Sequence, residues 1–112
     1  MNKMEYNIIM INIEDLRKIN YAERFAVTEH AKVRLSERKI KLKDIIKCVE
    51  NGEIIEQYET DKPLPSCLVL GMSVENNYIH AVVSTDGEFI YLITAYYPNL
   101  QRWNNDYKTR RN

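Results

Sequence analysis

The stretch TEHAKVRLSERK carries a histidine and two arginines at intervals of four residues, His30, Arg34 and Arg38. Steps of four residues turn a helix by about 40° each, so these side chains lie along one border of a helix. Histidine exchanges protons near neutral pH, and arginine binds phosphate oxygens in a bidentate manner. The spacing therefore indicates a site that handles a phosphate. The alternative is a solvated helix edge, with the arginines paired to Glu53 or Asp61 and the histidine bonded to a backbone carbonyl.

Cleavage of RNA without a metal ion is one reaction that such residues serve. It requires a general base for the 2′-hydroxyl, a general acid for the departing 5′-oxygen, and cations for the charge on the phosphorane. Tyr91 is one candidate for orienting the phosphate or donating a proton. The main candidate catalytic residues are two histidines, two arginines and a second tyrosine: His30, His80, Arg34, Arg38 and Tyr96.

Aromatic side chains and a basic end indicate a surface for single-stranded nucleic acid. Unpaired bases stack on aromatic rings, and nearby cations bind the phosphates. The alternative is that the two terminal segments cover this surface and the tyrosines simply pack. The candidate nucleic-acid contacts are two tyrosines of predicted strands and three cations near the end of the chain: Tyr78, Tyr91, Lys108, Arg110 and Arg111.

The composition is that of an ordinary globular domain. Sixteen Lys and Arg balance sixteen Asp and Glu, so net charge does not indicate a nucleic acid or a membrane as partner. With 112 residues, 45% of them hydrophobic, we expect one domain over 1–112, monomeric or a small homo-oligomer. The run IIMINI is too short to span a bilayer and follows no basic segment, which favours a cytoplasmic protein. Cys48 and Cys67 lack metal-ligand spacing, so we expect reduced core thiols and neither a metal nor another cofactor.

The elements that must position these residues divide into a helical first half and a strand-rich second half. Helix starts are indicated at Asn12 and Thr28, and an apolar stripe predicts a third helix over 42–51. Runs rich in β-branched and aromatic residues follow, separated by DKPLP, ENN and TDGE. We expect an α+β domain with N-terminal helices packed on one face of a roughly four-stranded antiparallel meander sheet, then a short C-terminal helix. The expected parts are an N-terminal extension, a helical part, the sheet, and a C-terminal helix with a basic tail: 1–11, 12–52, 53–97 and 98–112.

Two turn signals predict the register of the sheet. A two-residue loop at 86–87 pairs Val83 with Ile90, and another at 76–77 brings the preceding strands into register. One face then forms the core under the helices: Leu68, Leu70, Met72, Val74, Ile79, Ala81, Val83, Ile90 and Leu92. The opposite face carries aromatic, hydroxyl and imidazole groups: Val69, Gly71, Ser73, Tyr78, His80, Val82, Phe89, Tyr91, Ile93 and Tyr97.

This register separates the candidate catalytic residues. It places His80 and Tyr91 on the open face, but Thr94 and Tyr96 on the helix face. These groups converge only if a β-bulge shifts the register or if the site lies at an edge of the sheet. We expect the final helix to lay Trp103 against the sheet, together with Tyr107.

Several motifs occur in order: HA followed by Arg34 and Arg38, then NGEIIEQY, DKPLPSCLVLG, YIHAVV, YLITAYYP, and Trp103 with a basic end. Over about positions 12 to 111 this pattern resembles a bacterial family of domains of unknown function. The family's pattern is similar to the RelE-type fold, in which helices precede a small antiparallel sheet. The resemblance implies a toxin of a toxin–antitoxin pair. The family tends to have Gly at position 39 and Ser or Thr at position 41, where this chain has Lys39 and Lys41.

The leading hypothesis is a toxin-like, metal-independent ribonuclease whose partners are RNA and a cognate antitoxin protein. Two other classes of function fit the same sequence. One is a non-catalytic protein-binding module that uses an exposed sheet edge for strand addition. The other is a small-molecule-binding domain with a pocket between the helices and the sheet. The first hypothesis requires turnover, and the other two require binding alone.

Overall fold

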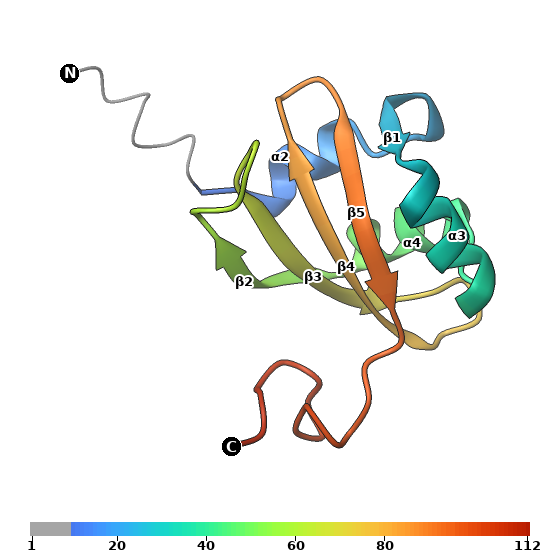
Figure 1. Cartoon of the computed structure of the whole chain (residues 1–112), viewed down its shortest axis with the longest axis vertical. Coiled ribbons are helices and arrows are strands. Elements are labelled where there is room, and N and C mark those ends of the chain that lie inside the picture. Colours follow the sequence, from blue (N-terminus) through green and yellow to red (C-terminus); the bar gives the residue numbers. More distant parts are fainter. Residues whose placement is uncertain (1–9) are drawn as a thin grey trace.

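The computed structural model describes residues 10–112, so the expected N-terminal extension lies almost wholly outside the described residues. Within them, helices and strands follow in the order α2, η1, β1, α3, α4, β2, β3, β4, β5. The five strands form one sheet in the order β1-β5-β4-β3-β2 (Figure 1). The domain is therefore of the α+β class, as predicted.

The helices begin where the sequence predicts. α2 spans Ile13–Lys18, and the Asn12 side chain accepts a first-turn backbone N–H at 2.8 Å. α3 spans Glu29–Arg38, and the Thr28 hydroxyl accepts a first-turn N–H at 3.1 Å. Both contacts satisfy amide groups that a helix start leaves without partners. α4 spans Leu42–Asn51, as predicted.

A short strand lies just before α3, where the sequence showed no strand signal. The 3-10 helix η1 (Ala22–Arg24) leads into β1 (Phe25–Val27), which pairs in parallel with β5 (Ile90–Tyr96). The prediction of a four-stranded, purely antiparallel meander is therefore wrong. Three residues are too few to show a period of two, and the partner strand is far away in the sequence.

The other strands are antiparallel and build the body of the sheet. They are β2 (Glu53–Tyr58), β3 (Ser66–Met72) and β4 (Tyr78–Thr85). α4 packs on β3 and β4, with α2 beside it, while α3 runs along β5 at the edge of the sheet (Figure 1). We call the sheet face opposite α4 the outer face. All candidate groups discussed below lie on it or around its rim.

The pairing of β3 with β4 differs from the predicted register by an odd number of residues. The connection is a five-residue loop over 73–77, in which Ser73 and Asn77 bond through backbone and side chain at 2.8 and 3.0 Å. An odd shift exchanges the two faces of a strand. The prediction that Leu68, Leu70, Met72 and Val74 form the core under the helices is therefore wrong, and β3 turns the following residues toward α4: Cys67, Val69 and Gly71.

Gly71 shows why the observed face fits α4. A Cβ atom at this position would lie 2.3 Å from the Cys48 carbonyl oxygen, so only glycine permits the helix to approach this closely. Cys48 and Cys67 are fully buried in this core, as predicted, and burial raises the pKa of each thiol to about 12.

A β-bulge changes the second half of β5. The pairing of Val83 with Leu92 and of Val82 with Thr94 leaves Ile93 as the extra residue. Before the bulge, the four-residue loop over 86–89 replaces the predicted two-residue loop, but this even shift keeps the predicted core face. After the bulge the faces exchange. The prediction that Thr94 and Tyr96 lie on the helix face is therefore wrong, and both lie on the outer face.

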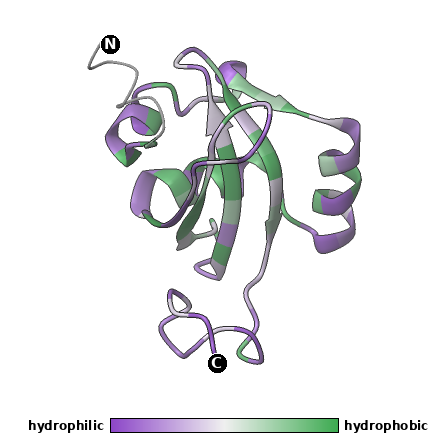
Figure 2. Cartoon of the chain, turned by 60° about the vertical axis from the view of Figure 1, so that its left-hand side comes forward, coloured by the Kyte–Doolittle hydropathy of each residue, from purple (hydrophilic) through white to green (hydrophobic). Residues whose placement is uncertain are grey.

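Apolar residues, green in Figure 2, concentrate on the strands and on parts of the helices. Their buried side chains form one core between α4, α2 and the sheet. Leu16, Ile45 and Ile79 are among the fully buried members of this core. No helix in the described part of the chain is long and apolar enough to cross a membrane.

Residues 98–112 form turns rather than the predicted C-terminal helix, and we call this segment the clasp. The side chains of Asn99 and Asp106 each accept two backbone N–H groups that follow them, which competes with helix formation. Trp103 nevertheless lies against the sheet, only 2% exposed, and Tyr107 packs on Tyr78, as the sequence predicts.

Candidate functional site

The three motif residues of α3 have different surroundings. His30 is exposed in the first turn. Arg34 forms a 3.2 Å ion pair with Glu37 on the same helix, and Arg38 reaches β5. The sequence also allowed a structural role, in which these arginines pair with Glu53 or Asp61. This pairing is not found, and the acidic strand β2 forms its ion pairs with the clasp instead.

Arg38 joins α3 to the edge of the sheet. Its Nη1 atom donates to the Thr94 hydroxyl at 3.2 Å and to the Ala95 carbonyl at 2.8 Å. β5 extends past the short strand β1, so this carbonyl would otherwise be an unpaired edge group. Arg38 therefore stabilises the position of α3, and with it the position of His30.

His30 lines a groove of about 840 Å³ on the outer face. The groove lies between β1, the start of α3, the ends of β4 and β5, and the loop that joins β2 to β3. The lining of the groove is mainly apolar, with Val27 and Ile93 among its residues. The polar groups that line it are a hydroxyl, an imidazole, a carboxylate, an ammonium and two further hydroxyls: Thr28, His30, Asp61, Lys62, Ser84 and Tyr91.

Two of these groups are engaged by neighbouring side chains. The Tyr91 hydroxyl donates to Asp86, which raises the pKa of Tyr91 and lowers the pKa of Asp86 to about 2. The Ser66 hydroxyl donates to Asp61. Tyr91 is therefore a neutral phenol that lines the groove, and its hydroxyl proton is donated to the Asp86 carboxylate. His30 and Lys62, an imidazole and an ammonium group, are the other ionisable side chains of the lining.

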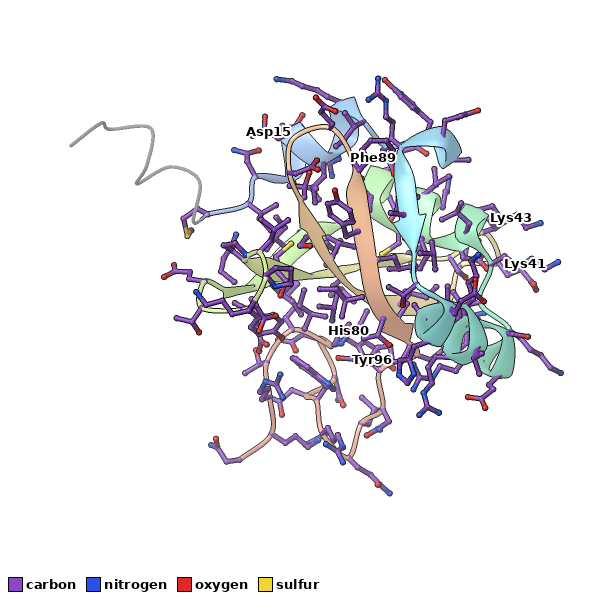
Figure 3. All side chains as sticks on the ribbon, turned by 45° about the horizontal axis from the view of Figure 1, so that its top comes forward. Asp15, Lys41, Lys43, His80, Phe89 and Tyr96 are labelled. Atoms are coloured by element: carbon purple, nitrogen blue, oxygen red, sulfur yellow. The ribbon has the colours of Figure 1, made fainter. Side chains whose placement is uncertain are left out.

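His80 lies in a different environment, fully buried on the outer face of β4. Its Nε2 atom is 2.8 Å from the Tyr107 carbonyl oxygen, and its Nδ1 atom is 3.3 Å from the Tyr96 hydroxyl. Because a carbonyl only accepts, Nε2 carries the proton and Nδ1 accepts from Tyr96. Figure 3 shows His80 and Tyr96 side by side next to the clasp. Burial lowers the pKa of His80, which favours this neutral form.

The clasp closes over this imidazole with aromatic and charged groups. The Trp103 ring meets the His80 ring edge-on, with centroids 4.5 Å apart. Arg110 lies over Trp103 at 4.7 Å and makes two hydrogen bonds of 2.9 and 3.0 Å with Glu56 of β2. Arg110 lowers the pKa of Glu56, and burial with the Glu56 hydrogen bond raises the pKa of Tyr58 to about 12. We call these residues, with Tyr96 and Tyr107, the His80 cluster.

The structure therefore sorts the predicted site residues into two groups. The bulge brings His80 together with Tyr96, whereas His30 lies with Tyr91 in the groove. The predicted nucleic-acid contacts divide as well: Tyr78 is 45% exposed, but the clasp cations are paired. Their partners are Glu53 for Lys108, Glu56 for Arg110, and the Leu100 carbonyl with the Asn105 side chain for Arg111.

Sequence reasoning missed Glu56, Tyr58 and Lys62. The first two stand two residues apart in EIIEQYE, so period-two reading places them on one face of a strand. No sequence signal places Lys62 in the same groove as His30, since the loop that carries it is positioned only by the folded sheet. Among residues 10–112, no group of three His, Cys, Asp or Glu side chains is placed to hold a metal ion.

The fold and the groove define a small α+β domain with a five-stranded sheet and a ligand-sized groove on its outer face. The chain belongs to the family described as a domain of unknown function, DUF4258, whose family model matches residues 27–97. This confirms the predicted membership of a family of unknown function, whereas the RelE-type similarity stays a prediction. No curated protein and no solved structure matches the chain. The match includes α3 and the groove strands β4 and β5, but only the last residue of β1, and the clasp lies beyond the last matched residue.

Proposed function

We propose that the protein cleaves single-stranded RNA at the groove without a metal ion, as a toxin of a toxin–antitoxin pair. The observation that carries the proposal is the exposed His30 imidazole in a groove of about 840 Å³, with Lys62 in the same lining. An imidazole supplies proton transfer, and an ammonium stabilises the anionic phosphorane.

In the proposed reaction, His30 removes the proton from the 2′-hydroxyl. The 2′-oxygen attacks the adjacent phosphorus, and the bond from phosphorus to the 5′-oxygen breaks. The products are a 2′,3′-cyclic phosphate and a 5′-hydroxyl, which takes a proton from solvent. Lys62 of the groove lining binds the phosphate, and a neighbouring base stacks on the Tyr91 ring. Arg34, one turn of α3 after His30 and outside the lining, is a second cation for the phosphate.

Arg38, His80 and Tyr96 act indirectly in this proposal. Arg38 positions α3 through its bonds to β5, while His80 and Tyr96 hold the clasp on the sheet. A cognate antitoxin, if it acts by occlusion, covers the groove. In this assignment each of the five candidate catalytic residues has a role, but only His30 transfers a proton.

A small-molecule-binding domain is the second candidate, because the groove lining is mainly apolar. Val27, Leu92 and Ile93 contribute to it, and a groove of about 840 Å³ accommodates a drug-sized molecule. His30 and Lys62 then bind an acidic group of that molecule. This candidate predicts saturable binding with no effect on RNA.

Induced expression in a bacterial host tests the leading proposal. We expect the wild-type chain to arrest growth and fragment total RNA, and His30→Ala and Lys62→Ala to relieve both effects. Lys32→Ala is the matched control, because Lys32 lies on the exposed side of α3 in an ion pair with Glu29. Circular dichroism of each purified variant verifies folding.

Normal growth and intact RNA at high expression of the wild-type chain would contradict the proposal. A purified assay sharpens the result: cleavage should persist with excess EDTA and leave 2′,3′-cyclic phosphate ends. Relief by Lys32→Ala as strong as that by Lys62→Ala would show that the groove is not the site.

A further inference from the structure

A second hollow lies on the outer face at the other end of β4, away from the groove. It has a volume of about 410 Å³ and is formed by the β3–β4 loop, the residues after β5, and the clasp. Its lining consists of three tyrosines, two asparagines and a proline: Asn76, Asn77, Tyr78, Tyr97, Pro98 and Tyr107. We call it the tyrosine hollow.

The tyrosines of this hollow are displayed rather than buried. Tyr78 is 45% exposed and Tyr97 is 41% exposed. Tyr78 and Tyr107 have ring centroids 4.7 Å apart with planes tilted by 31°, so together they form an aromatic wall. Among residues 10–112, none of the three hydroxyls makes a hydrogen bond to protein. The hydroxyl groups of all three tyrosines are therefore available to a ligand.

Polar groups that suit the edge of a nucleobase stand beside the rings. Asn76 and Asn77 each carry an amide with both donors and an acceptor, the combination that pairs with base edges. Asn76 is held at φ 64° in the loop, and the Asn77 backbone is bonded to Ser73, so both positions are fixed. The clasp also carries the exposed cation Arg102, which can meet a phosphate, whereas Lys108 is paired with Glu53.

We propose that the tyrosine hollow binds one nucleobase of a single-stranded RNA, which stacks on Tyr97 or on the Tyr78 wall. The proposal rests on the proposed function and extends it. Tyr78 and Ser84 are six residues apart on β4, or about 20 Å at the usual rise of a strand. An RNA strand that lies along the sheet thus meets the groove with one nucleotide and the hollow with another several positions away.

Binding of a non-cleavable 2′-O-methyl oligonucleotide to the purified full chain tests this subsite. Fluorescence anisotropy at fixed, low salt gives the affinity. We expect Tyr97→Ala and Tyr78→Ala each to weaken binding by about 5- to 100-fold, because a stacked base contributes that much by alanine substitution. Tyr97→Phe and Tyr78→Phe should bind like wild type, since they keep the ring. Tyr21→Ala is the control, because Tyr21 is 51% exposed and does not line the hollow.

Tyr97 makes no aromatic pair with the clasp, so its variant tests stacking even if Tyr78→Ala disturbs Tyr107. Absence of oligonucleotide binding by wild type would overturn the subsite. Wild-type affinity in both alanine variants would overturn it as well, as would equal losses in the phenylalanine variants.

The outcomes separate this proposal from the ribonuclease proposal. Loss of binding in Tyr97→Ala without any RNA cleavage by wild type supports the hollow and contradicts the ribonuclease. Cleavage that depends on His30, together with normal binding by both Tyr97→Ala and Tyr78→Ala, supports the ribonuclease and contradicts the hollow. A 2′-O-methyl probe makes the two readouts independent, because it has no 2′-hydroxyl to attack.

Discussion

The groove and the His80 cluster present the same kinds of side chain on one sheet face, with opposite accessibility. Each contains an imidazole, an aromatic ring and a cation. In the groove, the imidazole of His30 is exposed at the rim. In the cluster, both ring nitrogens of His80 are bonded, and Trp103 and Tyr107 shield it from solvent.

This difference teaches that residue type alone does not identify a catalytic imidazole. A buried histidine with two satisfied nitrogens resists protonation and has no path to a substrate, so it fits a structural role. An exposed histidine in a groove keeps both nitrogens for a ligand. The account therefore assigns chemistry to the groove and stability to the cluster.

The largest effect is expected at the centre of the cluster. Trp103→Ala should lower the free energy of unfolding by about 3–5 kcal/mol, because a large buried ring is lost from beneath the clasp. Urea unfolding followed by circular dichroism measures it. Leu100→Ala is the control, since Leu100 is 46% exposed and should change stability by less than about 0.5 kcal/mol. Equal effects of the two variants would mean that the clasp does not hold the sheet.

An intermediate effect is expected where α3 meets β5. Arg38→Ala should cost about 1.5–3 kcal/mol of unfolding free energy, since it removes charged hydrogen bonds to Thr94 and the Ala95 carbonyl. Arg34→Ala should cost at most about 1 kcal/mol, because its ion pair with Glu37 is solvent-exposed. The same unfolding assay compares them. A larger cost for Arg34→Ala would contradict the anchoring role given to Arg38.

The smallest effect is a slope of stability with pH. The pKa of His80 is lower in the folded protein than in the unfolded chain, so the unfolded chain binds more protons in acid. The stabilisation from neutral His80 is complete above the unfolded value near 6.5 and is lost as pH falls from there through the folded pKa. His80→Gln should flatten the unfolding free energy between about pH 6.5 and pH 5. Glu56, whose pKa is lowered by Arg110, acts in a separate window below 4.5. If the slope of unfolding free energy against pH is unchanged in His80→Gln, a group other than His80 causes it.

The helices α2, α3 and α4 and the fold class could be predicted because their signals are local, whereas the predicted C-terminal helix is replaced by turns. Caps such as Asn12 and Thr28, and the apolar stripe of α4, act within a few residues of chain. The register of the sheet could not be predicted, because it depends on the conformations of the loops that join the strands. Ser73 and Asn77 close a five-residue loop that inverts β3, and the extra residue Ile93 inverts the end of β5.

The sequence indicated which residues belong to the candidate site, but not which of them lie together in the fold. His30 and His80 stand out in the sequence, yet only the bulge in β5 decides that Tyr96 joins His80. The sequence pattern includes Trp103 as a residue that covers the sheet, but burial of His80 under it follows from the turns of the clasp. Lys62 enters the groove through tertiary structure alone.

The most direct test of the account compares His30→Gln with His80→Gln in purified protein, measuring RNA cleavage and unfolding free energy for both. We expect His30→Gln to lose about 10²- to 10⁴-fold in cleavage rate while stability changes by less than about 0.5 kcal/mol. His80→Gln should lose about 1–3 kcal/mol of stability and keep wild-type cleavage per folded molecule. Cleavage that survives in His30→Gln but disappears in folded His80→Gln would contradict the assignment of chemistry to the groove.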